Sequence, residues 1–343
     1  MIKPQKLKKG DKVATISLSW GGAGDIPHRY AIGKKQIEET FGLEVVETRN
    51  ALKPSDWIYR NPKARAEDLM EALEDKSIKA IISNVGGDDS IRLLKYVDIN
   101  KIKENPKIFI GFSDTTVTHF AFYKAGVVSF YGTSTLVGFA ENNGMHQYQI
   151  NDINRTLFST QPVGIITPNQ KGWTSELLDW GDPVNQSKSR KLEKSTGWRF
   201  LQGSGRVSGQ LLGGCLEVLE TLKDTEFWIS PKSWKGKIMF LEPSDFMLDP
   251  EYFGWILRNY AASGILQNIN GLIFGRPYHN KYWREYDGVI IKVLNEEGLN
   301  DLPIITGMDF GHTCPTFTIP FGIMAEIDSE QKSFTILENA VIE

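Results

Sequence analysis

Short apolar segments alternate with helix-like segments through the first half of the chain, and this alternation most constrains the fold. The run Ile78–Ser83 is continuous and apolar, as in strands buried on both faces of a parallel sheet. Strands are expected at 12–19, 43–48, 78–83 and 107–112, and helices at 28–41, 64–73, 90–96 and 115–125. This order predicts an α/β N-terminal domain built around a parallel sheet.

The pattern changes after about residue 151. Residues 162–209 are rich in Gly, Pro, Ser, Lys and Trp and have no sustained period, which is typical of a linker followed by a long loop. Helices are expected beyond it at 214–223 and 252–263, and strands at 237–241, 271–275, 302–306 and 333–338. A chain of 343 residues is too long for one ordinary core. We therefore expect an N-terminal α/β domain over 1–165 and a mixed α+β domain with more isolated strands over 166–343, with the long loop at 170–209.

Composition excludes several classes of partner. The net charge of -3 gives no general attraction to a nucleic acid polymer or an anionic membrane. No stretch approaches the roughly 18 apolar residues of a membrane helix. The two cysteines, Cys215 and Cys314, form no disulfide framework and indicate a reducing, cytoplasmic location. Ligand spacings typical of zinc are absent, so we expect neither a metal nor another cofactor.

Ser113 is the first candidate for chemistry. It follows the strand 107–112 directly and precedes a helix, so its hydroxyl would stand on a tight turn at the sheet edge. The segment Gly111-Phe-Ser-Asp-Thr115 resembles a nucleophile elbow with threonine in place of the last glycine. In such a turn the N–H of Asp114 points toward a developing oxyanion. The alternative is that these residues only form an ordinary helix N-cap, for which serine and aspartate are preferred.

Gly86 and Gly87 follow the neighbouring strand, Ile78–Ser83. Glycines let a backbone approach a ligand closely, and their N–H groups can complete an oxyanion hole. The alternative is a plain turn with an aspartate cap. Phosphate-binding glycine motifs do not occur in the chain.

A serine nucleophile needs a base, and the chain has five histidines. His312 has the most suitable position, because it follows a strand and Gly311. The base needs an acceptor that fixes its tautomer. Glu242 ends the apolar strand 237–241, where a carboxylate must find a partner or stay exposed. Asp245 and Asp309 are the competing acceptors.

Taken together, the motifs resemble the LD-carboxypeptidase family of serine peptidases over nearly the whole chain. The resemblance rests on Arg65, Gly86-Gly87, Ile110-Gly-Phe-Ser-Asp114, Gly213-Gly214, Leu241-Glu242 and Gly311-His312. It implies a flavodoxin-like N-terminal domain that carries the serine, a β-rich C-terminal domain that carries the glutamate and histidine, and a homodimer. It also implies a Ser113, Glu242 and His312 triad and an oxyanion hole of the Gly87 and Asp114 N–H groups.

The form Val85-Gly-Gly-Asp-Asp89 and the insertion bearing tryptophans resemble the microcin C immunity branch of this family. That branch implies a peptidyl-nucleotide or small peptide substrate, with Gly86 beside it. Trp180 or Trp173 would stack on a nucleobase, although either tryptophan could equally pack under its own loop. Arg276 would bind a substrate carboxylate or form a structural ion pair.

The sequence thus predicts a serine hydrolase that cleaves an amide bond in aminoacyl- or peptidyl-nucleotide compounds of the microcin C type. One alternative is a murein tetrapeptide LD-carboxypeptidase of cell-wall recycling, which uses the same triad. The other is a non-catalytic two-domain protein that binds a small ligand.

Overall fold

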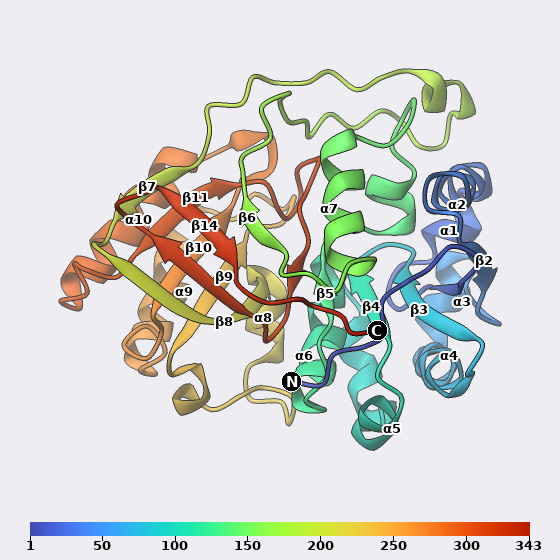
Figure 1. Cartoon of the computed structure of the whole chain (residues 1–343), viewed down its shortest axis with the longest axis horizontal. Coiled ribbons are helices and arrows are strands. Elements are labelled where there is room, and N and C mark those ends of the chain that lie inside the picture. The colour runs from blue at the N-terminus through green and yellow to red at the C-terminus, as the bar shows by residue number, and fades with distance from the viewer.

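The computed structural model describes all of residues 1–343 as two sheets that lie side by side, each with its own helices (Figure 1). A single continuous apolar core includes buried residues of both sheets, so the two halves are packed together as one body. Both chain ends lie between the halves, where Ile2 bridges Val127 and Gln5 bridges Ile342.

The first sheet has six strands in the order β12-β5-β4-β3-β1-β2. Its parallel strands are β1 (Lys12–Ile16), β2 (Glu44–Glu47), β3 (Ile78–Ser83), β4 (Ile108–Gly111) and β5 (Phe130–Tyr131). The order 2-1-3-4-5 is that of flavodoxin-like folds, as the family resemblance implies. The loops after β1, β3 and β4 therefore meet at the carboxyl edge of the sheet, where ligands bind in such folds.

Helices of this half are α1 (Gly22–Asp25), α2 (Pro27–Phe41), α3 (Ser55–Arg60), α4 (Pro62–Glu74), α5 (Ile99–Glu104), α6 (Thr116–Lys124) and α7 (Gln147–Leu157). Shorter turns are the 3₁₀ segments η1 (Ser90–Tyr96) and η2 (Ser113–Thr115), and the π-helical η3 (Thr135–Phe139). The expected helices over 28–41, 64–73 and 115–125 are confirmed. Residues 90–96 form a 3₁₀ rather than an α-helix, and the Asp114 carboxylate caps its start by accepting from the Ser90 N–H.

The second sheet has eight strands in the order β6-β14-β13-β8-β9-β10-β11-β7. They are β6 (Gly164–Ile166), β7 (Arg199–Gln202), β8 (Arg206–Cys215), β9 (Lys237–Glu242), β10 (Gly271–Gly275), β11 (Ile304–Met308), β13 (Met324–Asp328) and β14 (Ser333–Ile336). Strands β8 to β11 run parallel and the remaining strands pair antiparallel at the two sides.

Three helices accompany this sheet: α8 (Leu216–Leu222), α9 (Pro250–Ala262) and α10 (Trp283–Glu296). The short turns η4 (Pro183–Ser187), η5 (Pro231–Trp234) and η6 (Tyr278–Asn280) complete it. None of the helices of the chain has both the length and the apolar character needed to cross a bilayer.

Two strands, β6 and β12, do not follow the division of the chain into an N-terminal and a C-terminal half. Strand β6 spans the expected boundary at 165/166 and pairs with β14 in the second sheet, while β12 (Ile319–Pro320) pairs with β5 in the first. The expected loop 170–209 is also only partly irregular, because β7 and the start of β8 fall within it. Its irregular part is pinned by bridges from Trp173 to Glu193 and from Thr174 to Cys314.

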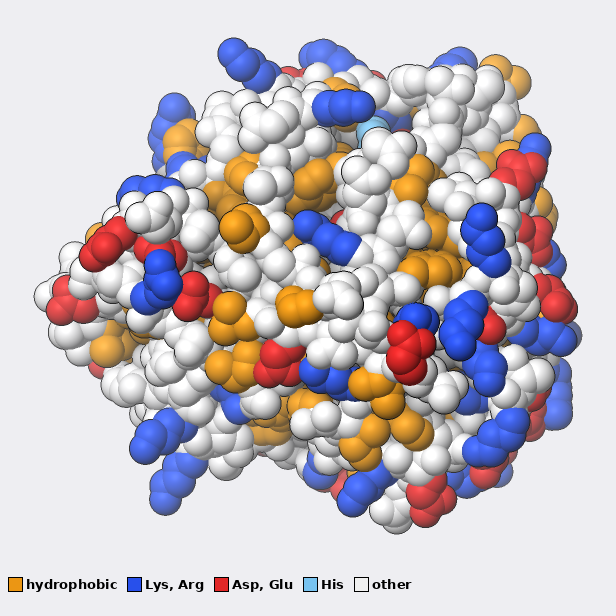
Figure 2. All heavy atoms as spheres, in the orientation of Figure 1, with side chains coloured by type: hydrophobic (Ala, Val, Ile, Leu, Met, Phe, Trp, Pro, Cys, Tyr) orange, Lys and Arg blue, Asp and Glu red, His pale blue; other side chains and the backbone are white.

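The face seen in Figure 2 has no large area of one charge. Basic and acidic side chains are interspersed around its edge, and apolar side chains are grouped nearer the centre. This distribution agrees with the near-neutral composition of the chain.

Candidate active site

Ser113 stands directly after β4, at the carboxyl edge of the first sheet. Its φ of 61° lies in the left-handed region, which is unusual for a residue other than glycine. Such strain persists only where the surroundings fix it, and it often marks a functional turn. The sharp turn presents the Ser113 side chain to the cavity described below.

His312 and Glu242 come from the second half and meet Ser113 across the junction of the two sheets. The Ser113 hydroxyl donates to His312 Nε2 over 3.0 Å, and His312 Nδ1 donates to Glu242 Oε2 over 2.7 Å. Glu242 ends β9, and His312 lies in the loop after β11, two strands away in the same sheet. The structure thus brings together the three side chains that the sequence selects, with the geometry of a nucleophile, a base and an orienting carboxylate.

The electrostatics of this trio depend on the Glu242 carboxylate, which is fully buried. Burial acts to lower the pKa of His312, but the charge and hydrogen bond of Glu242 outweigh it, and the pKa is raised above the usual 6.5. Phe112 packs edge-on against the imidazole at 5.1 Å between ring centroids and further fixes its orientation. Glu242 can therefore stabilise the imidazolium that forms when a serine proton is taken.

Gly86 and Gly87 lie directly beside Ser113. A Cβ on Gly86 would stand 2.9 Å from Ser113 Cβ and 3.4 Å from the Asp114 nitrogen, and one on Gly87, whose φ is 140°, would collide with Ser19. Only glycine therefore allows this loop to approach the serine so closely. The Gly87 N–H has no hydrogen-bond acceptor within the chain.

The Asp114 side chain connects the two loops. Its carboxylate accepts from the N–H groups of Asp89 and Ser90 over 3.0 and 2.8 Å, and the Ser90 hydroxyl donates to the Asp114 carbonyl over 2.7 Å. Burial raises the pKa of Asp114, although these hydrogen bonds favour its charged form. The loop after β3 and the turn after β4 are thereby held as one unit.

A buried ion pair supports this unit from behind. Arg65 on α4 donates to Asp89 over 2.6 Å and to the Leu18 carbonyl over 2.9 Å. Its side chain is completely buried. The sequence alone gave Arg65 no role in the site, because no spacing signal connects it with a loop 24 residues away.

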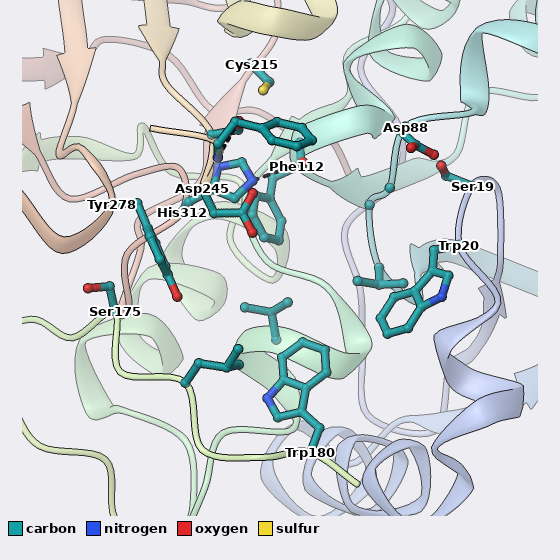
Figure 3. Close-up of a pocket in the computed structure, with 18 of the residues that line it drawn as sticks. Ser19, Trp20, Asp88, Phe112, Ser175, Trp180, Cys215, Asp245, Tyr278 and His312 are labelled. Carbon is teal, nitrogen blue, oxygen red and sulfur yellow. Dashed lines mark hydrogen bonds between the residues drawn. The ribbon is translucent and has the colours of Figure 1, made fainter. Parts of the chain in front are cut away.

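A cavity of about 790 Å³ opens in front of Ser113 and His312. Figure 3 shows His312, Asp245 and Phe112 on one side of it, with Trp180 and Trp20 on the opposite wall. Exposed apolar side chains of Leu177, Phe246 and Tyr59 also contribute to its lining. The cavity therefore joins the reactive serine to a wide aromatic and apolar surface, which suits a ligand with a planar ring.

Trp180 reaches this cavity from the long irregular segment. The Arg29 guanidinium lies 4.2 Å from its ring centroid, and its carbonyl is hydrogen-bonded to His28 Nε2 over 2.8 Å. Trp180 thus packs on the first half of the chain and lines the cavity as well. The two expectations for this residue, a ligand platform and a packed loop side chain, are compatible.

Trp173 and Arg276 lie outside the cavity. Arg276 is buried, donates to Asp309 over 2.9 Å and stands 5.0 Å from the Trp173 ring centroid. This arrangement corresponds to the structural ion pair that the sequence left open, not to a group that meets a substrate carboxylate in the cavity. Asp309, the competitor of Glu242, is engaged there, whereas Asp245 lines the cavity.

The other histidines are engaged by partners away from Ser113. His119 is fully buried between Ser129 and the Gly111 carbonyl, and burial lowers its pKa to about 3. His279 meets the Ser175 hydroxyl at 2.9 Å, and His146 lies 3.5 Å from Glu141. No group of three or more His, Cys, Asp or Glu side chains is close enough to hold a metal ion.

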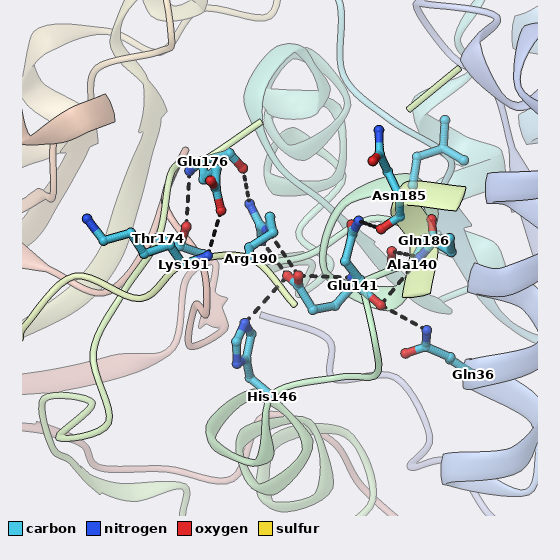
Figure 4. Close-up of polar contacts among 12 residues, drawn as sticks. Gln36, Ala140, Glu141, His146, Thr174, Glu176, Asn185, Gln186, Arg190 and Lys191 are labelled. Carbon is cyan, nitrogen blue, oxygen red and sulfur yellow. Dashed lines mark hydrogen bonds and ion pairs between the residues drawn. The ribbon is translucent and has the colours of Figure 1, made fainter. Parts of the chain in front are cut away.

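The segment that carries Trp180 is fastened to the first half by one charged cluster (Figure 4). Arg190 donates through Nε to Glu141 over 2.8 Å and through a second nitrogen to the same carboxylate. Burial opposes ionisation of Glu141, but His146 and Arg190 outweigh it and lower its pKa to about 2. Arg190 also donates to the Glu176 carbonyl over 3.1 Å, so it links two points of the segment to the domain beneath.

Tyr131 is a further residue of the site that sequence reasoning missed. Its hydroxyl accepts from the Ser113 N–H over 3.0 Å and donates to Glu242 Oε1 over 2.5 Å. It lies in β5, a strand of two residues, and nothing in the local sequence signals this contact.

Comparisons with known proteins show the family of the chain. Residues 13–132 match the LD-carboxypeptidase N-terminal domain and residues 208–327 match the LD-carboxypeptidase C-terminal domain. The Microcin C7 self-immunity protein MccF of Escherichia coli is 28% identical over 345 residues, which cover 97% of this chain and 94% of MccF.

Solved structures give the same result. An MccF-like protein from Streptococcus pneumoniae in complex with AMP has a TM-score of 0.87 and 31% identity, over 95% of this chain and 98% of that one. MccF in complex with aspartyl sulfamoyl adenosine has a TM-score of 0.85 and 26% identity, over 100% of both chains. The chain therefore belongs to the LD-carboxypeptidase family and is similar along its whole length to the MccF-like proteins.

Proposed function

We propose that this protein is a serine hydrolase that cleaves the amide bond between an aminoacyl or peptidyl group and a nucleotide-like moiety, as in compounds of the microcin C type. The observation that carries the proposal is the hydrogen-bonded series from Ser113 through His312 to Glu242 at the wall of an aromatic cavity. Two MccF-like relatives are bound to AMP or to aspartyl sulfamoyl adenosine, which supports a ligand of this class.

In the proposed reaction, Ser113 attacks the carbonyl carbon of the scissile amide while His312 takes its proton. The N–H groups of Gly87 and Asp114 stabilise the oxyanion of the tetrahedral intermediate. His312 then protonates the leaving nitrogen, and the acyl group remains on Ser113. Water, activated by His312, releases the acyl group and restores the serine.

The charges of the cavity favour this substrate over a murein tetrapeptide. A carboxypeptidase must accommodate the terminal carboxylate of its leaving group, usually beside a cation. Arg190 is the only Arg or Lys of the lining, and its guanidinium is paired with Glu141. Asp88 and Asp245 line the same cavity, and the lining has no unpaired Arg or Lys for the carboxylate of a D-alanine leaving group.

The discriminating experiment supplies the wild type with aspartyl sulfamoyl adenosine and, separately, with a murein tetrapeptide that ends in D-alanine. We expect aspartate and sulfamoyl adenosine from the first and little D-alanine from the second. Release of D-alanine together with an intact nucleoside substrate would support the murein alternative instead.

A serine-directed fluorophosphonate probe addresses the non-catalytic alternative. Labelling of the wild type but not of Ser113→Ala would exclude a protein that only binds its ligand. The absence of labelling and of hydrolysis would favour the binding protein.

We also propose a homodimer, as the family resemblance implies, and a cytoplasmic location, as the cysteine content indicates. The two cysteines are free and buried, which supports a reducing compartment. Light scattering and cell fractionation test these two points separately from the chemistry.

A further inference from the structure

The Tyr131 hydroxyl connects the two ends of the Ser113, His312 and Glu242 series. It donates to Glu242 Oε1 over 2.5 Å and accepts the Ser113 N–H over 3.0 Å. Because Ser113 Oγ also reaches Glu242 through His312, these four residues form a closed ring of hydrogen bonds. The ring joins both halves of the chain, since Tyr131 and Ser113 belong to the first sheet region and His312 and Glu242 to the second.

Glu242 has little else to stabilise its charge. The carboxylate is fully buried, and its Oε2 is occupied by His312. The backbone around it is packed so closely that a Cβ on Gly275 would lie 2.8 Å from Glu242 Cβ, and one on Gly311 would lie 2.6 Å from Oε2. A buried carboxylate needs a donor at each oxygen, and Tyr131 supplies the donor at Oε1.

The Ser113 backbone needs Tyr131 in the same way. The residue holds a left-handed φ of 61°, and its N–H points to the tyrosine oxygen instead of a strand or helix carbonyl. An N–H engaged with Tyr131 is not free to bind a substrate oxyanion, which leaves that task to other N–H groups. Tyr131 thus fixes which face of the turn meets the substrate.

We propose that Tyr131 is a positioning residue of the triad, which holds the Glu242 carboxylate against His312 and fixes the strained backbone of Ser113. This inference rests on the proposed function and adds a residue to its site. Tyr131 touches no substrate, because the cavity lining does not include it and its side chain is buried.

The test is Tyr131→Phe, which keeps the ring and removes only the hydroxyl. Without the donor at Oε1, the carboxylate attracts the His312 proton more strongly, so the pKa of His312 should rise by about half a unit or more. The acid limb of kcat/KM should move to higher pH by the same amount. We expect kcat to fall about ten- to a hundredfold with little change in KM, because the lost contact orients the reacting groups and not the substrate.

Other titratable groups lie near His312 and Tyr131, and these groups are the same in the wild type and in the variant. They are Asp245 after β9, Glu217 on α8 and Cys215 at the end of β8. The matched control is Tyr260→Phe, which removes a hydroxyl from an equally buried tyrosine on α9 that does not line the cavity. It should leave the His312 pKa and kcat as in the wild type.

Histidine NMR gives the pKa of His312 in wild type and variants without any substrate. If the wild type cleaves no amide substrate, the proposed function fails, yet the NMR comparison still tests Tyr131. A His312 pKa that is unchanged in Tyr131→Phe, or an equal fall of kcat in both tyrosine variants, would overturn the proposal.

Discussion

The Nε2 atom of His312 lies 3.0 Å from the Ser113 hydroxyl, although 199 residues separate the two in sequence. The contact forms because the loop after β11 in one sheet faces the turn after β4 in the other. Both sheets share a continuous core, so packing of the two halves brings the groups together. The site therefore exists only in the folded, docked arrangement of both halves.

Glu242→Gln keeps the shape of the side chain and removes its charge. Since catalysis needs neutral His312, kcat/KM of the wild type should rise with pH through a pKa above 6.5. In the variant, burial still lowers the pKa of His312, but the carboxylate that raises it is gone. The rise of kcat/KM should therefore move to lower pH, and kcat should fall about 10³- to 10⁴-fold. The exposed Glu39→Gln serves as the control. If kcat/KM of Glu242→Gln rises over the same pH range as in the wild type, the role of the carboxylate is contradicted.

Gly86→Ala tests the close approach of the glycine loop. The added methyl would stand 2.9 Å from Ser113 Cβ, so the loop or the serine must shift and turnover should fall at least about a hundredfold. Gly288→Ala is the matched control, because its Cβ meets nothing within 4 Å on the exposed face of α10. That control should keep full activity and gain about 0.5–1 kcal/mol of stability. Equal activity of both variants in a steady-state assay would show that the loop does not need glycine.

Trp180→Ala tests the aromatic wall of the cavity. Loss of stacking should raise the Kd for AMP about five- to a hundredfold in isothermal titration calorimetry, with a smaller effect on kcat. Trp255→Ala, on the exposed face of α9, removes the same ring from a position that does not line the cavity and should leave the Kd unchanged. If the Trp180 variant binds AMP as tightly as the wild type, Trp180 is only a packing residue.

Arg190→Gln should loosen the segment that carries Trp180. The variant leaves the buried Glu141 without its arginine partner, which should cost about 3 kcal/mol of unfolding free energy. The Glu141 pKa is about 2 in the folded protein, below its usual 4.5, so the pair stabilises the fold above pH 4.5 and this contribution fades as pH falls toward 2. Urea unfolding should show the difference in unfolding free energy between variant and wild type at neutral pH, and this difference should disappear in acid.

The control is Arg258→Gln, which removes an arginine from the exposed pair with Glu296. It should cost less than about 1 kcal/mol at any pH, and an equal cost in both variants would contradict this account.

Local sequence predicts those parts of the site in which one element determines the position of a side chain. Ser113 follows an apolar strand, Glu242 ends another, and His312 follows a glycine, so their exposure at sheet edges could be inferred from the strands themselves. That the strands of the first sheet run parallel follows in the same way from the alternation of strands and helices.

Contacts between distant segments could not be predicted. Tyr131 belongs to a strand of two residues, and its two partners are 18 and 111 residues away. Strand β12 joins the first sheet from the far end of the chain, and β7 lies in a segment whose composition indicates a loop. Arg276 and Trp173 carry the residue types of a ligand site, yet tertiary packing pairs Arg276 with Asp309 and places Trp173 against its guanidinium, outside the cavity.

The rate of aspartyl sulfamoyl adenosine hydrolysis by Ser113→Ala tests the central claim most directly. We expect turnover to fall about 10³-fold or more, with the melting temperature near that of the wild type, while the exposed Ser230→Ala remains fully active. Hydrolysis by Ser113→Ala at the wild-type rate would contradict the assignment of Ser113 as the nucleophile, and with it the triad.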